Sequence, residues 1–204
     1  MISAYDNRAA RGTGQLHLML RLGDVRICYA YIRKNGCSCF KAALGYPAAT
    51  RISEIACRHR RRWFQGHDAA IFVWRDPLDR LLSLYRNKIL DRIGADDILC
   101  RYRAAMGREP SDFESFVRFA MLGVDPHCLP QTAHLRPMLY THAIPLAGLH
   151  RAMAAIVGTD AAAAFRQPVN SSAAHPVEVS DRALALVHAH YAADYRMIGR
   201  LRQD

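Results

Sequence analysis

Two segments of this chain lead from a short apolar run, through a polar turn, into a helical pattern. The first apolar run covers residues 25–32 and the second covers residues 69–74. Both runs are rich in apolar β-branched and aromatic residues, which is typical of buried strands. Polar turns at the carboxyl ends of such strands bind ligands in α/β proteins, and the turns here contain Lys34 and Arg75. We therefore expect two anion-binding turns, which suit a ligand phosphorylated at two places.

The remaining sequence alternates between apolar runs and amphipathic patterns. An outer strand is predicted at residues 16–22 and a further strand at 138–144, whereas residues 1–14 are predicted to form an irregular arm. Helices are predicted at 38–44, 51–64, 77–93, 97–106, 111–122, 147–157 and 180–199. No linker or repeat divides the chain, so we expect one α/β domain over residues 1–204, with three layers in which helices flank a mostly parallel central sheet.

Capping residues mark several of these helices. Asp76 is predicted to be an N-cap, with Pro77 at the first helical position behind it. Ser111 and Ser180 are predicted to cap the helices that follow them, and Gly199 is predicted to end the last helix.

The charge of the chain favours an anionic partner. The formal net charge is +10, which is compatible with a nucleotide, an acidic glycan, a nucleic acid or a membrane surface. Only three of the 28 basic residues are lysines, and Lys34, Lys41 and Lys88 all lie in or beside the two turns. Lysine delivers a compact point charge to a phosphate, so these positions suggest phosphate chemistry; the alternative is that three residues carry no pattern. The arginine run at 58–62 is interpreted as a solvated face or as a contact for an acidic acceptor.

The cysteines and the apolar runs indicate the cellular environment. The six cysteines show neither a C-x-x-C pair nor zinc spacing, so we expect reduced thiols and no metal. No segment has the pattern of a signal peptide, and no apolar run approaches the roughly 20 residues that a membrane-spanning helix needs. These features predict a cytoplasmic protein without integral membrane association.

Taken together, the motifs resemble the PAPS-dependent sulfotransferases, particularly the carbohydrate (Golgi-type) branch. The turn at 33–39 is similar to the family's loop for the 5′-phosphosulfate, and 75–83 matches its R-D-P-x-x-R-x-x-S element. Residues 125–131 resemble its H-W-x-P-Q stretch, and 191–195 its closing Y-x-x-D-Y helix. The resemblance spans roughly residues 25–200 and implies a P-loop-like fold. Golgi members carry a membrane anchor, so the chain looks like a soluble, bacterial-like member.

The resemblance implies 3′-phosphoadenosine 5′-phosphosulfate (PAPS) as the co-substrate, adenosine 3′,5′-bisphosphate (PAP) as the product and no metal. Lys34 would stabilise the leaving phosphate. The residues implied in binding the nucleotide are Arg33, Lys34, Asn35, Gly36, Cys37, Ser38 and Cys39 around the 5′-phosphate, Arg75 and Ser83 at the 3′-phosphate, and Asn170 and Ser171 in a late loop. A capped surface turn is the alternative for that late loop, and Arg80 is interpreted as a phosphate ligand or as a support of its turn. Arg33 and Cys39 depart from the family pattern, which commonly has Pro and Ser or Thr there.

Sulfuryl transfer also needs a base for the proton of the acceptor hydroxyl, and histidine is suited to this because its ordinary pKa is about 6.5. His127 is the first candidate because it lies in the stretch that resembles H-W-x-P-Q, although Cys128 replaces the Trp and the alternative is that His127 orients the substrate or the nucleotide. His67, just before the second buried strand, is the second candidate. Tyr191 and Asp194 are expected to fasten the last helix to the core.

The expected activity is transfer of the sulfuryl group to a hydroxyl of a saccharide or glycolipid, with no nucleic acid as partner. One alternative is a P-loop-type nucleotide kinase or NTPase, which magnesium dependence and γ-phosphate turnover would reveal. Lys34 precedes Gly36, whereas the Walker A lysine follows its second glycine, so the pattern disfavours this class. The other alternative is a basic nucleic-acid-binding module, for which steeply salt-dependent binding is expected.

Overall fold

The computed structural model describes residues 3–62, 65–166 and 175–203. The chain divides into two compact units, the first formed by residues 1–75, 131–170 and 200–204, and the second by 76–130 and 171–199. The expectation of one domain over the whole chain stays a prediction.

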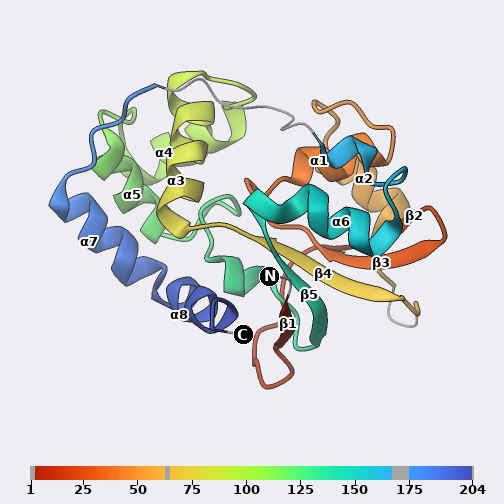
Figure 1. Ribbon diagram of the computed structural model, residues 1–204. Helices are drawn as coiled ribbons and strands as arrows, with labels where there is room; N and C mark the ends of the chain where they lie inside the picture. Colours follow the sequence, from red (N-terminus) through yellow and green to blue (C-terminus); the bar gives the residue numbers. More distant parts are fainter. Residues whose placement is uncertain (1–2, 63–64, 167–174, 204) are drawn as a thin grey trace. The chain divides into compact units, whose positions relative to one another are not determined.

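The first unit contains a five-stranded mixed sheet (Figure 1). In spatial order its strands are β1 (Ser3–Asp6), β5 (Leu139–Pro145), β4 (Ala69–Trp74), β3 (Val25–Ala30) and β2 (His17–Leu22). The three central strands are parallel, but β2 is antiparallel to β3 and β1 is antiparallel to β5. The expected mostly parallel sheet is thus corrected to a mixed one. The reason at one edge is the short connection: only Gly23 and Asp24 separate β2 from β3, and so short a turn joins antiparallel strands.

The segment 1–14, expected to be irregular, contributes the edge strand β1. Its residues alternate between half-buried and exposed, and Tyr5 packs edge-on against Phe72 with ring centroids 5.6 Å apart. A four-residue strand interrupted by a bulge leaves too short a pattern to be recognised from sequence.

One face of the sheet carries the hydrophobic core of the first unit. The strand residues on it include Leu18, Tyr29, Ile71, Val73 and Ile144. Helices α1 (Cys37–Ala43), α2 (Ile52–His59) and α6 (Leu149–Val157) add side chains to this same core. These three helices therefore lie on one face of the mixed sheet, and the expected three-layer arrangement stays a prediction. Helix α2 ends before the predicted residue 64, because Arg60 is extended and pairs with Leu18 of β2.

The second unit is helical, with a separate hydrophobic core. Its elements are α3 (Pro77–Tyr85), the π-helical turn Arg86–Leu90, α4 (Asp96–Met106), α5 (Phe113–Met121) and α7 (Asp181–His190), and α8 (Ala192–Leu201) begins in it (Figure 1). The predicted cap of α3 is confirmed, since the Asp76 carboxylate accepts hydrogen bonds from the amides of Leu78 and Asp79. The π-helical turn breaks the three- and four-residue periodicity, which explains why Ile93, predicted on the buried face, is 58% exposed.

Two helix boundaries differ from the prediction. Asp112, not Ser111, caps α5, because its carboxylate accepts the amide hydrogen of Ser115 in a capping box. The single last helix is divided at Tyr191, and Gly199 lies inside α8 instead of ending it. The Ser180 cap is confirmed by its hydrogen bond from the Ala183 amide. Among the described residues, no helix combines the length and apolar character needed to cross a membrane.

Candidate functional site

The first polar turn joins β3 to α1 and has a strained backbone. Lys34 has a φ of 66°, and Gly36, the residue before α1, has a φ of 74°. A Cβ atom on Gly36 would lie 2.8 Å from Leu146 Cδ1 and 3.0 Å from Leu149 Cδ2. The left-handed backbone therefore favours glycine at position 36, and a Cβ there would also have to displace the ends of the Leu146 and Leu149 side chains.

Asn35, between these two residues, fastens the turn to the neighbouring strand. Its side chain is fully buried, and Nδ2 donates to the carbonyl oxygen of Val73 at 2.7 Å and to Oε1 of Gln131 at 2.6 Å. The resemblance placed Asn35 among the nucleotide-binding residues. In the structure its amide hydrogens are committed to protein partners, so its side chain supports the turn.

Gln131 connects this turn to the second one. It is fully buried, and besides accepting from Asn35 it accepts the amide hydrogen of Arg75 on Oε1 at 3.0 Å. Its Nε2 donates to the carbonyl oxygen of Arg75 at 2.8 Å. Sequence reasoning assigned no role to Gln131, although it closes the stretch that resembles H-W-x-P-Q.

The two turns thus meet at one edge of the sheet. Because β3 and β4 are parallel neighbours, the Lys34 turn and Arg75 both follow carboxyl ends of strands, as predicted. The side chains of Lys34 and Arg75 belong to half-buried residues. Two cationic residues are therefore held on adjoining turns of the first unit.

The residues around the start of α1 differ in how far they can reach a ligand. Cys39 is buried in the sheet core, whereas Cys37 and Ser38 are half-buried.

The Arg33 guanidinium lies 5.7 Å from the centroid of the Tyr31 ring. Burial, together with the nearby Cys37, raises the pKa of Tyr31 far above its ordinary value, so Tyr31 stays neutral.

The other two lysines hold loops. Lys41 Nζ donates to the carbonyl oxygens of Ala48 and Thr50 at 3.1 and 2.6 Å. Lys88 Nζ donates to those of Ile93 and Gly94, both at 2.7 Å. These contacts give Lys41 and Lys88 a structural role. Of the three lysines, Lys34 is the one that remains a candidate for binding phosphate.

The structure does not bring His67 together with the two turns. His67 precedes β4, at its amino end, whereas Lys34 follows the carboxyl end of the parallel strand β3. Burial lowers the pKa of His67, and the charge of Arg61 acts in the same direction.

His127, in the second unit, is paired with a buried carboxylate. Its Nδ1 lies 2.7 Å from Oδ1 of Asp125, which is fully buried and accepts a further bond on Oδ2 from Arg101 at 2.6 Å. Burial would raise the pKa of Asp125, but the hydrogen bonds from His127, the charge of His127 and the hydrogen bond from Arg101 outweigh it and hold that pKa well below its usual range. An ionised Asp125 favours the tautomer that carries hydrogen on Nδ1 and a lone pair on Nε2. Sequence reasoning missed Asp125, although it stands two residues before the candidate base.

The backbone around His127 is held from two sides. Arg80 is 2% exposed, and its guanidinium donates to the carbonyl oxygens of Leu129 at 2.9 Å and His127 at 3.0 Å. The Tyr191 hydroxyl donates to the carbonyl oxygen of Cys128 at 2.7 Å. Of the two interpretations of Arg80, these contacts favour support of the chain. They also show Tyr191 fastening its helix to the core, as predicted.

The structure says less about three other residues that were predicted to bind the nucleotide. Ser83 is a half-buried residue of α3 in the second unit. Asn170 and Ser171 lie outside the described residues.

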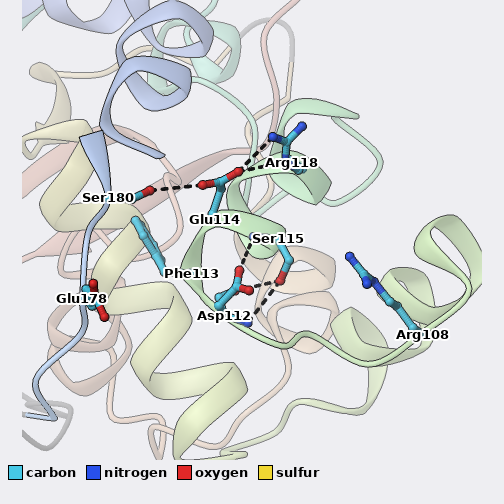
Figure 2. A pocket seen from close by; sticks show the side chains of 8 residues that line it. All are labelled: Arg108, Asp112, Phe113, Glu114, Ser115, Arg118, Glu178 and Ser180. Atoms are coloured by element: carbon cyan, nitrogen blue, oxygen red, sulfur yellow. Dashed lines mark hydrogen bonds and ion pairs between the residues drawn. The ribbon is translucent and has the colours of Figure 1, made fainter. Parts of the chain in front are cut away.

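A cavity of about 330 Å³ lies elsewhere in the second unit (Figure 2). Its lining residues are Arg108, Asp112, Phe113, Glu114, Ser115, Arg118, Glu178 and Ser180, none of which was predicted as a site residue. Figure 2 shows that several of these groups bond to one another: Glu114 accepts from Arg118 and Ser180, and Asp112 caps α5. Over the described ranges, no cluster of three His, Cys, Asp or Glu residues could hold a metal ion.

A comparison with protein-family models finds a match that covers both polar turns. The model of the sulfotransferase family matches residues 18–148, which include Lys34, Arg75 and Gln131 and cover more than half of the chain. Carbohydrate sulfotransferase 14 of Mus musculus is 30% identical over 139 residues, covering 56% of this chain and 36% of the relative. The chain thus spans about a third of the length of the curated relative it matches, and no solved structure matches it. The chain belongs to the sulfotransferase family.

Proposed function

We propose that this protein transfers the sulfuryl group from PAPS to a hydroxyl of a carbohydrate or glycolipid, leaving PAP. The observation that carries the proposal is the pair of cationic turns at the carboxyl ends of β3 and β4, held together by Gln131 within the family-matched stretch. Two such turns suit a nucleotide with phosphates at two positions.

The residues present fit a doubly phosphorylated nucleotide. Lys34 supplies a compact cation on a turn whose left-handed backbone is held by Gly36 and Asn35. Arg75 supplies a planar fork for the 3′-phosphate, and its main-chain amide and carbonyl are both hydrogen-bonded to Gln131. We propose Ser83 as a further ligand of the 3′-phosphate and the main chain of residues 36–39 as ligands of the 5′-phosphate.

In the proposed reaction the acceptor oxygen forms a bond to sulfur as the bond between sulfur and the bridging phosphate oxygen breaks. Lys34 stabilises the negative charge that remains on the phosphate, and a base removes the proton of the acceptor hydroxyl. We propose His127 as the base, because Asp125 favours the tautomer in which Nε2 can accept a proton. His67 is the weaker candidate because it lies at the amino end of β4.

A saccharide acceptor is supported by two observations. The mouse relative is named as a carbohydrate sulfotransferase, and the net charge of +10 favours an acidic partner. Arg58, Arg60 and Arg62 are exposed and would suit such an acceptor.

Calorimetric titration with PAP, adenosine 5′-monophosphate and ATP tests the donor site. We expect wild-type protein to bind PAP most tightly, and the Arg75→Ala variant to lose about tenfold or more of that affinity because a charged hydrogen-bonding pair is worth roughly 1.5–3 kcal/mol. Arg21→Ala, at an exposed arginine of β2, is the matched control and should leave the affinity unchanged.

Radiolabelled sulfuryl transfer to a panel of saccharides then tests the activity. Equal affinity for all three nucleotides, or magnesium-dependent loss of the γ-phosphate of ATP, would contradict the proposal and favour a kinase or NTPase.

A further inference from the structure

The contact between Gln131 and the two turns replaces part of a strand ladder. Strand β3 leaves its pairing with β4 at Ala30, which lies opposite Phe72. Beyond that point the Val73 carbonyl accepts its hydrogen bond from the Asn35 side chain, at 2.7 Å. The main chain of Arg75 is paired with the Gln131 side chain through both its amide and its carbonyl, at 3.0 and 2.8 Å. Two buried side-chain amides therefore continue the pairing of β4 where the neighbouring strand has ended.

The chemistry of the contact is specific to a glutamine. Oε1 accepts from Asn35 and from the Arg75 amide, while Nε2 donates to the Arg75 carbonyl. A carboxylate at position 131 could keep the two accepted bonds but could not donate, and it would face a carbonyl oxygen. An apolar side chain would leave all three groups without this partner in the protein interior, where unsatisfied polar groups are costly.

The Gln131 contact also restrains the main chain of both turns. Asn35 lies directly between Lys34 and Gly36, both of which have positive φ, so holding its side chain constrains the main chain of the Lys34 turn. The same Gln131 amide constrains the main chain of Arg75, directly after the end of β4. One buried group thus couples the two turns.

We propose that Gln131 is a positioning residue that sets the distance between the Lys34 turn and Arg75, and so makes the protein select a nucleotide with two separated phosphates over one with a single phosphate. This inference rests on the proposed function. Its physical basis is preorganisation: when both turns are already spaced for the ligand, binding the second phosphate needs no further ordering.

The test compares the affinity of the Gln131→Ala variant for PAP, adenosine 5′-monophosphate and adenosine 3′-monophosphate with that of wild type. We expect PAP binding to weaken about tenfold, within the usual range of coupling between two sites, while binding of each monophosphate changes less than about threefold. General damage to the fold would weaken all three ligands alike. Equal losses for the three ligands, or an unchanged affinity for PAP, would overturn the inference.

Two further variants keep the test decisive. Gln131→Met keeps the approximate length of the side chain, adds no charge and removes the amide contacts, so it should show the same selective loss of PAP affinity even if Gln131→Ala does not fold. Gln65→Met, at an exposed glutamine whose Oε1 accepts only from the Arg62 amide among the described contacts, is the matched control and should bind all three ligands as wild type does. If wild type itself shows no preference for PAP, the proposed function fails; if wild type prefers PAP and Gln131→Met keeps that preference, the inference alone fails.

Discussion

At the scale of single residues, the pair formed by Asp125 and His127 differs from an ordinary surface ion pair. Asp125 is fully buried, and its two oxygens bind His127 and Arg101 in a fixed arrangement. The His127 amide also donates to Asp125 Oδ1, at 2.8 Å. Orientation of the ring therefore depends on the carboxylate as well as on the backbone contacts made by Arg80 and Tyr191.

Replacing Asp125 by asparagine should slow the reaction while leaving the donor site intact. The neutral amide no longer stabilises the imidazolium that forms when His127 takes the proton, so we expect kcat to fall about 10²-fold or more with little change in the KM for PAPS. Steady-state kinetics of sulfuryl transfer measure both values. Asp97→Asn, which removes an exposed carboxylate of α4, should behave as wild type. An unchanged kcat in Asp125→Asn would count against His127 as the base.

At the scale of elements, the turn between β3 and α1 is the most demanding local structure. Its backbone enters the left-handed region at Lys34 and again at Gly36, and Asn35 is buried between them. A lysine in this region is costly, roughly 1–3 kcal/mol, and such strain persists where surrounding contacts enforce it. Here the contacts come from Val73 and Gln131 on one side and from Leu146 and Leu149 on the other.

Gly36→Ala and Gly45→Ala separate the backbone strain from the packing. Both glycines have positive φ, 74° and 77°, but nothing lies within 4 Å of a Cβ on Gly45. We expect Gly45→Ala to lower the free energy of unfolding by about 1–2 kcal/mol, from the left-handed backbone alone. Gly36→Ala should cost about 1 kcal/mol more, because the ends of the Leu146 and Leu149 side chains must shift to admit its Cβ. Urea unfolding measures the difference, and equal losses would show that the turn can relax away from α6.

At the scale of the whole molecule, stability is linked to buried titratable groups. His17 is fully buried in the first unit and lies 2.7 Å from the Tyr140 hydroxyl and 3.1 Å from the Gln15 carbonyl oxygen. Burial, reinforced by the charges of Arg136 and Arg61, lowers the pKa of His17 to about 4. The unfolded chain takes up a proton near pH 6.5, whereas the folded protein resists protonation until about pH 4.

The contribution of neutral His17 to the free energy of unfolding should therefore be fully present above about pH 6.5 and decline as the pH falls toward 4. The contribution of His17 amounts to about 2 kcal/mol between pH 7.5 and pH 5, from about 1.36 kcal/mol per unit of pKa difference. Urea unfolding at several pH values measures it. A His17→Gln variant should lose much of this pH dependence, with the remainder belonging to other histidines whose pKa is lowered by desolvation, such as the half-buried His190. An identical slope in the variant would contradict the assignment.

Local sequence pattern was sufficient to locate most of the elements. The strand predicted at 69–74 is β4 residue for residue, and the caps Asp76 and Ser180 are where expected. Apolar runs, caps and tight turns depend on residues that are neighbours in the chain, so the sequence alone established two strand-turn-helix segments and the family they resemble.

Only the tertiary structure decided which of the polar side chains in those segments bind protein groups. Asn35 and Gln131 are 96 positions apart, Gln131 and Arg75 are 56 apart, and Arg101 and Asp125 are 24 apart. No periodic pattern connects such distant residues, and their contacts exist only once the chain has buried them together. The same physical reason explains the mixed sheet and the buried Arg80, because pairing partners and burial are properties of the folded chain and not of any single segment.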